Sequence, residues 1–200
     1  MPNTFSAMLF RMNYIDRWGL KRNTRTESLA AHSLDAALIA HLLAHAAKTR
    51  FGAPVDPERV ACCALYHDAG EILTGDMPTP VKYSDASLRA EYKRVEREAE
   101  QRLAALLPED LAAGVAPFLT QDNLNERERA IVKAADKLSA LLKCVEEEQA
   151  GNREFRSAKE STLAALRRDP LPETEWFLEA CLPAYSMTLD ELMGKDGAPC

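Results

Sequence analysis

Apolar residues recur at helical spacing along almost the whole chain, and no run alternates in the way of a half-buried strand. The clearest stripe advances by three and four residues and ends before Pro108; it consists of Leu88, Tyr92, Val95, Ala99, Leu103 and Leu106. Similar patterns predict helices at about 5–12, 27–48, 56–70, 125–145 and 153–168, and another around Trp176. The sequence therefore predicts an all-α fold, a helical bundle.

Breaks in this helical pattern are few. Asp56 followed by Pro57 is typical of a helix start, and Asn125 is a candidate cap for a later helix. Only the segment Leu73–Tyr83 is predicted to be non-helical, because two prolines and a glycine oppose a helix there. No repeat or linker divides the 200 residues, so we expect a single domain with a core over about 4–192.

Composition narrows the class of partner. The net charge of −6 argues against a protein that binds nucleic-acid polymers, since such proteins carry basic surfaces. A small anionic substrate stays open, because a metal or a few arginines reverse the field in one cleft. The chain shows no signal peptide, no stretch of 18 apolar residues, and five scattered cysteines that indicate free thiols. We therefore expect a cytoplasmic protein without a membrane span.

Polar side chains occupy core-facing positions on three predicted helices. His32 lies within an apolar stripe, His67 and Asp68 continue another stripe at a helix end, and Asp136 borders a third. A carboxylate that faces a core is costly unless it is paired or bound to a metal. Two imidazoles and two carboxylates offer mixed ligation for a divalent first-row metal, with positions left for water and substrate. Such a metal activates water and polarises a phosphoryl oxygen, so the set favours hydrolysis.

Each of these residues has an ordinary alternative, because a lone inward His is usually a hydrogen-bonded core residue and a lone Asp is a cap or a surface residue. Their order is more specific: H…HD…D, with gaps of 35 residues (32 to 67) and 68 residues (68 to 136). This order resembles the HD-domain metal-dependent phosphohydrolases, an all-helical superfamily with these four ligands in the core of its bundle.

Longer strings extend the resemblance. HDAGEILTGDMPTPVKY at 67–83, preceded by NYIDRWGLKRNTRTESLAAHS at 13–33, is similar to the 5′-deoxynucleotidase family, which hydrolyses deoxyribonucleoside 5′-monophosphates. The similarity extends over essentially the whole chain, including AADKLSALLKCVEE around Asp136 and AGN at 150–152. One departure is Ala31, where relatives often carry Glu before the first ligand His.

The resemblance implies roles for particular side chains. It implies metal ligation by His32, His67, Asp68 and Asp136, with His32 and Asp68 also beside the substrate. It implies that Arg17 orients the phosphate during catalysis, and that further substrate contacts come from Trp18, Asp76, Met77, Pro78 and Thr79. The planar guanidinium fork suits a phosphate dianion, and a Trp suits the wall of a sugar pocket. The expected cofactor is a divalent cation: Co²⁺, Mn²⁺ or another borderline ion.

Glu71 is a further catalytic candidate, four residues after His67 and just beyond the predicted helix end. A carboxylate beside a metal–phosphate centre serves as a general acid or base. The alternative is a surface Glu at a helix terminus. The resemblance also implies a homodimer, with an interface patch expected at Phe155, Trp176, Phe177 and Leu178.

Three features are set aside. His41 and His45 have a spacing that binds zinc on one helix face, but they lie about 180° and 220° round the helix from His32, so we interpret them as packing or surface residues. The run Glu146–Glu148 and the segment KRVEREAEQR are interpreted as solvated faces. Cys62 and Cys63 have no matching base nearby.

Two other functions stay open. One is a different HD phosphohydrolase, such as a cyclic-nucleotide phosphodiesterase or an alarmone hydrolase, which product analysis distinguishes. The other is a non-catalytic regulatory module that kept the fold, which a metal analysis distinguishes.

Overall fold

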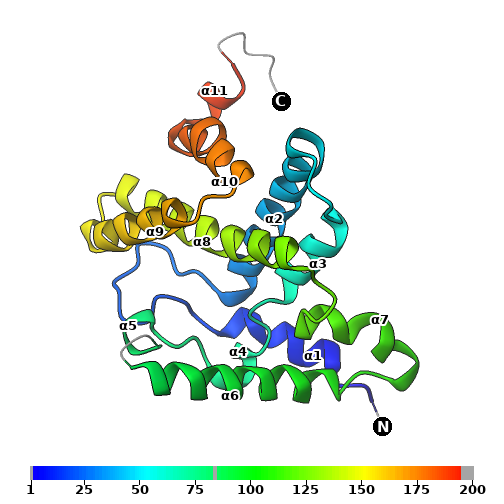
Figure 1. Ribbon diagram of the computed structural model, residues 1–200. Coiled ribbons are helices and arrows are strands. Elements are labelled where there is room, and N and C mark those ends of the chain that lie inside the picture. Colours follow the sequence, from blue (N-terminus) through cyan, green and yellow to red (C-terminus); the bar gives the residue numbers. More distant parts are fainter. Residues whose placement is uncertain (1, 83–84, 195–200) are drawn as a thin grey trace.

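Helices account for the regular structure, as the apolar spacing predicts (Figure 1). The computed structural model describes residues 2–82 and 85–194. Its elements in the first half of the chain are α1 (Phe5–Phe10), η1 (Arg11–Tyr14), α2 (Leu29–Phe51), α3 (Pro57–Tyr66), α4 (Glu71–Thr74), α5 (Thr79–Lys82) and α6 (Ala86–Ala104). Those in the second half are α7 (Glu109–Thr120), α8 (Glu126–Gln149), η2 (Arg153–Phe155), α9 (Arg156–Arg168), α10 (Pro172–Trp176), η3 (Phe177–Cys181), η4 (Leu182–Ser186) and α11 (Leu189–Leu192).

Helix starts follow the capping signals of the sequence. Asp56 caps α3 by accepting the backbone N–H of Arg59, and Pro57 occupies the first turn, as predicted. Asn125 caps α8 in a reciprocal capping box with Glu128, which confirms the predicted start of that helix. These local signals fix where two of the long core helices begin.

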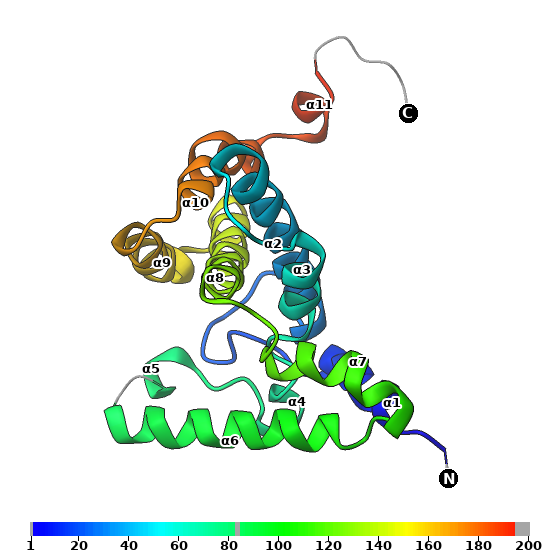
Figure 2. The same ribbon diagram turned by 45° about the vertical axis from the view of Figure 1, so that its right-hand side comes forward.

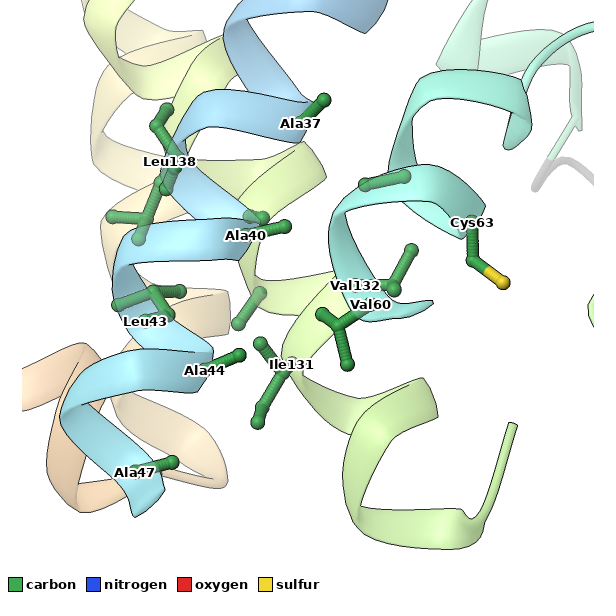
Figure 3. Close-up of a cluster of buried hydrophobic side chains, with 14 of the residues drawn as sticks. Ala37, Ala40, Leu43, Ala44, Ala47, Val60, Cys63, Ile131, Val132 and Leu138 are labelled. Carbon is green, nitrogen blue, oxygen red and sulfur yellow. The ribbon is translucent and has the colours of Figure 1, made fainter. Parts of the chain in front are cut away.

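The larger buried cluster lies where α2, α3 and α8 pack together (Figures 1 and 3). Ala40 and Ala44 of α2 face this cluster together with Val60 of α3 and Ile131 of α8 (Figure 3). Small side chains on α2 permit a close approach of the other two helices, and dense packing holds their relative positions. The helices that carry the predicted ligands are therefore rigidly placed.

A second buried cluster lies between α1, η1, α6, α7 and the start of α2, and α6 runs along this side of the molecule (Figure 2). Leu29 belongs to this cluster, whereas Ala37, two turns later on α2, belongs to the larger one. Likewise Ala64 belongs to the larger cluster and Ala69 to the second. The segments that contain His32 and His67 thus lie where the two clusters meet.

The structure differs from the predicted elements in three places. The helix expected over 56–70 ends at Tyr66, because a tight turn follows it. The segment Leu73–Tyr83, expected to be non-helical, begins with the last two residues of α4 and contains the one-turn helix α5. Pro80 is tolerated there, since a proline in a first turn interrupts no intrahelical hydrogen bond. Tyr83 lies outside the described residues. Helix α7 was not predicted, and it carries Pro117.

The prediction that Phe155, Trp176, Phe177 and Leu178 form an apolar patch at a dimer interface is wrong. Phe155 and Phe177 are fully buried, and Trp176 and Leu178 are partly buried against the larger cluster. Trp176, Phe177 and Leu178 fill the contact of the C-terminal helices with the larger cluster, and Phe155 packs against Trp18, so the four residues form no outer face.

By length and composition α2 is the one described helix that could cross a membrane. Half of its most apolar window is buried inside the fold, where it packs against α3 and α8. Core helices of soluble proteins pass the same test, so this is weak evidence for a span.

Candidate active site

The four predicted metal ligands converge where the two buried clusters meet. His32 lies in the first turn of α2, His67 and Asp68 lie in the turn after α3, and Asp136 lies in the middle of α8. One ligand atom of each residue lies within 4.8 Å of the corresponding atoms of the others. The structure therefore brings together side chains that are far apart in the sequence.

The distances between these atoms suit a single cation. His67 Nε2 lies 3.1 Å from Asp68 Oδ2, and His32 Nε2 lies 3.2 Å from Asp136 Oδ1. The crossed pairs, His32 with Asp68 and His67 with Asp136, are separated by 3.6 and 3.8 Å. Nitrogen and oxygen ligands at about 2.0–2.2 Å from one ion lie about 3–3.6 Å apart. The residues present therefore fit a divalent cation.

Hydrogen bonds aim both imidazoles at this point. His67 Nδ1–H donates to the carbonyl oxygen of Ala64 over 2.6 Å, because a carbonyl only accepts. His32 Nδ1 is hydrogen-bonded to Ser139 Oγ over 3.0 Å. Each ring thereby presents Nε2 to the carboxylates, and this is the usual arrangement of metal-binding histidines, whose other nitrogen is held by the protein.

The pKa values of these groups show that the site favours positive charge. Burial lowers the pKa of His67, but Asp68 and Asp136 outweigh it and raise that pKa well above its ordinary value. Burial raises the pKa of Asp136, but the hydrogen bond with His32 and the nearby charge of His67 hold it well below the ordinary value. A cation that binds here displaces protons from the ligands, so its affinity rises with pH.

Arg17 reaches the same centre from the loop before α2. Its Nη1 donates to Asp68 Oδ2 over 3.1 Å, and its Nε donates to Glu27 Oε2 over 3.2 Å. The same Glu27 oxygen accepts the Trp18 indole N–H over 2.8 Å. Glu27 is buried and positions both predicted substrate residues. Sequence reasoning missed it, and the only signal was an acidic residue just before the cap of α2.

Trp18 is held in a strained backbone conformation. Its φ of 61° lies in the left-handed region, which bulky residues rarely adopt. The Trp18 ring packs edge-on against Phe155 at 5.1 Å between centroids. Burial raises the pKa of the Asp76 carboxyl, and Arg17 and the Trp18 backbone N–H oppose this rise. Strained residues of this kind are enriched at ligand sites, where the surrounding contacts maintain them.

The other predicted substrate residues follow in the loop between α4 and α5. Asp76 is partly buried, and its contact with Trp18 places it beside the Arg17 loop. Met77 and Pro78 come next and are also partly buried. Thr79 begins α5, and its side chain lies outside the described part of the chain.

Glu71 is the first residue of the short helix α4, so the expectation of a C-terminal helix position is wrong. The side chain is buried, and its Oε2 has no hydrogen-bond partner among the described residues. Burial, together with the charges of Asp68 and Asp76, raises the pKa of this carboxyl to about 9. In the absence of a bound cation, burial and the neighbouring carboxylates therefore favour the protonated form of Glu71.

A buried ionic network anchors the Arg17 loop, which we define as residues 15–28 before α2, to α8. Glu147 is completely buried, which corrects its interpretation as part of a solvated face. Its carboxylate accepts hydrogen bonds from the Lys143 ammonium, the Asn152 amide, and the backbone N–H and hydroxyl of Thr24. Lys143 also donates to the Arg25 carbonyl over 2.5 Å. Glu147 and Lys143 lie one helical turn apart, which was the available signal.

We expect Glu147→Ala to destabilise the protein by about 3–5 kcal/mol, because it leaves the buried Lys143 ammonium without its counter-ion. Urea unfolding measures the effect. The neighbouring variant Glu146→Ala is the matched control: Glu146 is exposed, and its pairs with Arg25 and, at 3.9 Å, with Lys143 contribute less than about 1 kcal/mol. Equal losses in the two variants would contradict the assignment.

Comparison with known proteins places this site in a family. A family model described as 5′-deoxynucleotidase YfbR-like matches residues 4–185. A 5′-deoxynucleotidase of Erwinia tasmaniensis is 48% identical over 191 residues and covers 94% of this chain and 95% of its own. The 5′-deoxynucleotidase YfbR of Shigella flexneri serotype 5b is 45% identical over 188 residues, 94% of each chain.

Solved structures agree on the fold. An HD-domain phosphohydrolase of Listeria innocua superposes with a TM-score of 0.77 and 26% identity, covering 91% of this chain and 88% of the other. The HD phosphohydrolase DatZ of cyanophage S-2L, described as bound to dA and one catalytic Zn²⁺ ion, gives 0.67 at 19% identity over 92% and 97% of the two chains. With its helical HD fold, this chain belongs to the YfbR-like 5′-deoxynucleotidase family.

Proposed function

We propose that the protein hydrolyses deoxyribonucleoside 5′-monophosphates to deoxyribonucleosides and inorganic phosphate. The observation that carries this proposal is the position of Arg17, whose Nη1 lies 3.1 Å from an Asp68 oxygen that also faces His32 and His67. A guanidinium beside a cation site is suited to hold a phosphate dianion between two positive groups. The activity of the named relatives supports the substrate class.

His32, His67, Asp68 and Asp136 are the proposed ligands of a divalent cation, and we propose Co²⁺ or Mn²⁺. When bound, such a cation lowers the pKa of a coordinated water and polarises a phosphoryl oxygen. The Arg17 guanidinium has N–H groups beyond the two that it gives to Glu27 and Asp68, and these orient the phosphate.

Glu71 is the proposed general acid. Burial and the charges of Asp68 and Asp76 raise its pKa to about 9 in the absence of a cation, so the carboxyl starts from a value well above that of an ordinary Glu. The chemistry requires one proton at the 5′-oxygen of the departing deoxyribonucleoside, and the Glu71 carboxyl donates it.

Trp18 and Asp76 are the proposed sugar contacts. Trp18 cannot easily turn away, because Glu27 holds the indole N–H and Phe155 packs against the ring. A rigid wall excludes an added 2′-hydroxyl more strongly than a deformable apolar pocket, which discriminates by only about 10²-fold. Asp76 is assigned to a sugar hydroxyl that ribonucleotides and deoxyribonucleotides share.

We expect Trp18→Ala to narrow the ratio of kcat/KM for dAMP over AMP, mainly by improving AMP. Asp76→Ala, in contrast, should weaken both substrates together. Paired kinetics with dAMP and AMP on the two variants measures the effect. An unchanged ratio in Trp18→Ala would place the discrimination elsewhere.

A phosphate-release screen tests the proposed function. Protein supplemented with Co²⁺ or Mn²⁺ is assayed with every ribonucleoside and deoxyribonucleoside 5′-monophosphate. Preferential release of phosphate from the deoxyribonucleotides supports the proposal. Activity confined to cyclic nucleotides or alarmones indicates the other HD activities, and metal-loaded protein without any activity indicates a regulatory module.

We also propose that the protein acts in the cytoplasm, as one catalytic domain in each chain of a homodimer. The N-terminal half of the exposed face of α2 supports an interface, since Leu34 and Leu38 are 53% and 62% exposed and lie one turn apart. His41 and His45 follow on the same face, at the edge of this interface. Cys63 and Cys144 are buried free thiols, which suits a reducing compartment. Light scattering that shows a monomer at all concentrations would contradict the dimer.

A further inference from the structure

A second cluster of metal-ligating side chains lies outside the candidate active site. His41, His45 and Glu58 each offer one ligand atom, and these atoms lie within 4.8 Å of one another. The chain has four histidines: His32 and His67 lie in the candidate active site, and the other two lie in this cluster. We propose that His41, His45 and Glu58 bind one Zn²⁺ ion at the surface of the protein.

Local structure brings the three side chains together. His41 and His45 lie one turn apart on the same exposed face of α2. The chain then turns at Gly52, where φ is 65°, and α3 returns against α2 from Pro57 onward. Glu58 lies in the first turn of α3 and so reaches the C-terminal half of α2. The ligands therefore come from both arms of one helical hairpin.

The imidazole geometry suits a tetrahedral ion. His41 Nε2 and His45 Nε2 lie 3.2 Å apart, and the ring centroids lie 4.6 Å apart with the planes at 86°. Two nitrogens that bind one tetrahedral Zn²⁺ at about 2.0–2.1 Å lie about 3.3–3.4 Å apart. Without an ion, one ring donates a hydrogen bond to the other, so the ion replaces a single proton between them.

This cluster cannot share the ion of the candidate active site. His41 follows His32 by nine residues, which is about 13.5 Å along the helix axis, and it lies on the opposite side of α2. That separation was the reason to set the pair aside in the sequence. It excludes a shared ion but not a separate one.

The donor set also narrows the choice of ion. Two imidazoles and one carboxylate suit Zn²⁺ better than Ca²⁺ or Mg²⁺, which prefer oxygen ligands alone. Three protein ligands leave one position for water, as the exposure of all three residues permits. Bound Zn²⁺ joins α2 to α3, the two elements whose opposite ends hold His32 and His67, and so stabilises the folded chain.

Equilibrium dialysis of metal-free protein against ZnCl₂, with thermal unfolding as a second readout, tests this site. Two equivalents are expected for the wild type and one for Asp136→Ala, whose active-site ligand set is incomplete. The variant His41→Gln/His45→Gln should also bind one equivalent. The triple variant, which combines these two substitutions with Asp136→Ala, should bind none. Zn²⁺ should raise the Tm of Asp136→Ala but not that of the triple variant.

Glu58→Gln tests the third ligand and should weaken the binding of Zn²⁺ at the surface site. Glu109→Gln is its matched control, because Glu109 is an exposed acidic residue in the first turn of α7. All these side chains except Asp136 are exposed, and melting of the metal-free variants verifies that they fold. The proposal is overturned if His41→Gln/His45→Gln binds as much Zn²⁺ as the wild type, or if Glu109→Gln weakens binding as much as Glu58→Gln does.

Discussion

Asp136→Ala is expected to reduce phosphate release from dAMP to the background level, a loss larger than the about 10²–10⁴-fold attributed to one proton-transfer group. The variant removes one of two carboxylates from a four-ligand set, so the cation that activates water is no longer held. Metal content after dialysis and phosphate release at saturating dAMP measure the effect. Added Mn²⁺ or Co²⁺ should stabilise the wild type against heat far more than the variant.

Lys137→Ala is the control for this experiment, because Lys137 is the next residue on α8 and is exposed. It should keep both metal and activity. Full metal occupancy together with full activity in Asp136→Ala would remove Asp136 from the ligand set.

The inward direction of the candidate ligands could be predicted because it follows local rules. His32 lies on the buried stripe of a long helix, and Asp136 borders another, so helical periodicity alone directs both toward the core. The capping residue Asp56 fixed the start of α3, which precedes His67 and Asp68. The capping residue Asn125 fixed the start of α8, which carries Asp136. The convergence itself required the resemblance, since periodicity gives a direction but no distance between helices.

The loop before α2 could not be predicted in the same way. Its geometry depends on Trp18 adopting a left-handed conformation, which no propensity favours for a bulky residue. It depends also on two buried carboxylates. Glu27 accepts hydrogen bonds from Arg17 and Trp18 of the same loop, whereas Glu147 accepts from Thr24, which is distant in sequence. Acidic residues on a helix are usually solvated, so only the tertiary contacts show that Glu147 is a core residue.

The position of Glu71 shows a similar limit. Sequence reasoning placed it just after a helix end and left its burial open, whereas the turn after α3 carries it to the start of α4, where it is buried. The role of the residue depends on this burial, because an exposed Glu is ionised at neutral pH and cannot donate a proton. Its raised pKa therefore follows from the fold and not from the residue type.

Glu71→Gln is expected to lower kcat by about 10²–10⁴-fold while metal content and the KM for dAMP stay near the wild-type values. The amide keeps the size of the side chain but cannot donate a proton to the leaving 5′-oxygen. In the wild type, kcat should fall on the alkaline side as Glu71 loses its proton. A bound cation lowers the pKa of about 9, so this fall begins below pH 9.

The pH profile of kcat separates this role from a structural one. Glu71→Gln should lack the alkaline fall, because no proton remains to be lost at that position. Glu100→Gln is the matched control: burial raises the pKa of Glu100 to about 7, yet Glu100 lies on α6 and is not among the site residues, so kcat and its pH profile should be unchanged. A Glu71→Gln enzyme with a raised KM and an unchanged kcat would make Glu71 a binding residue. If the alkaline fall of kcat persists in this variant, the group that loses its proton is a residue other than Glu71.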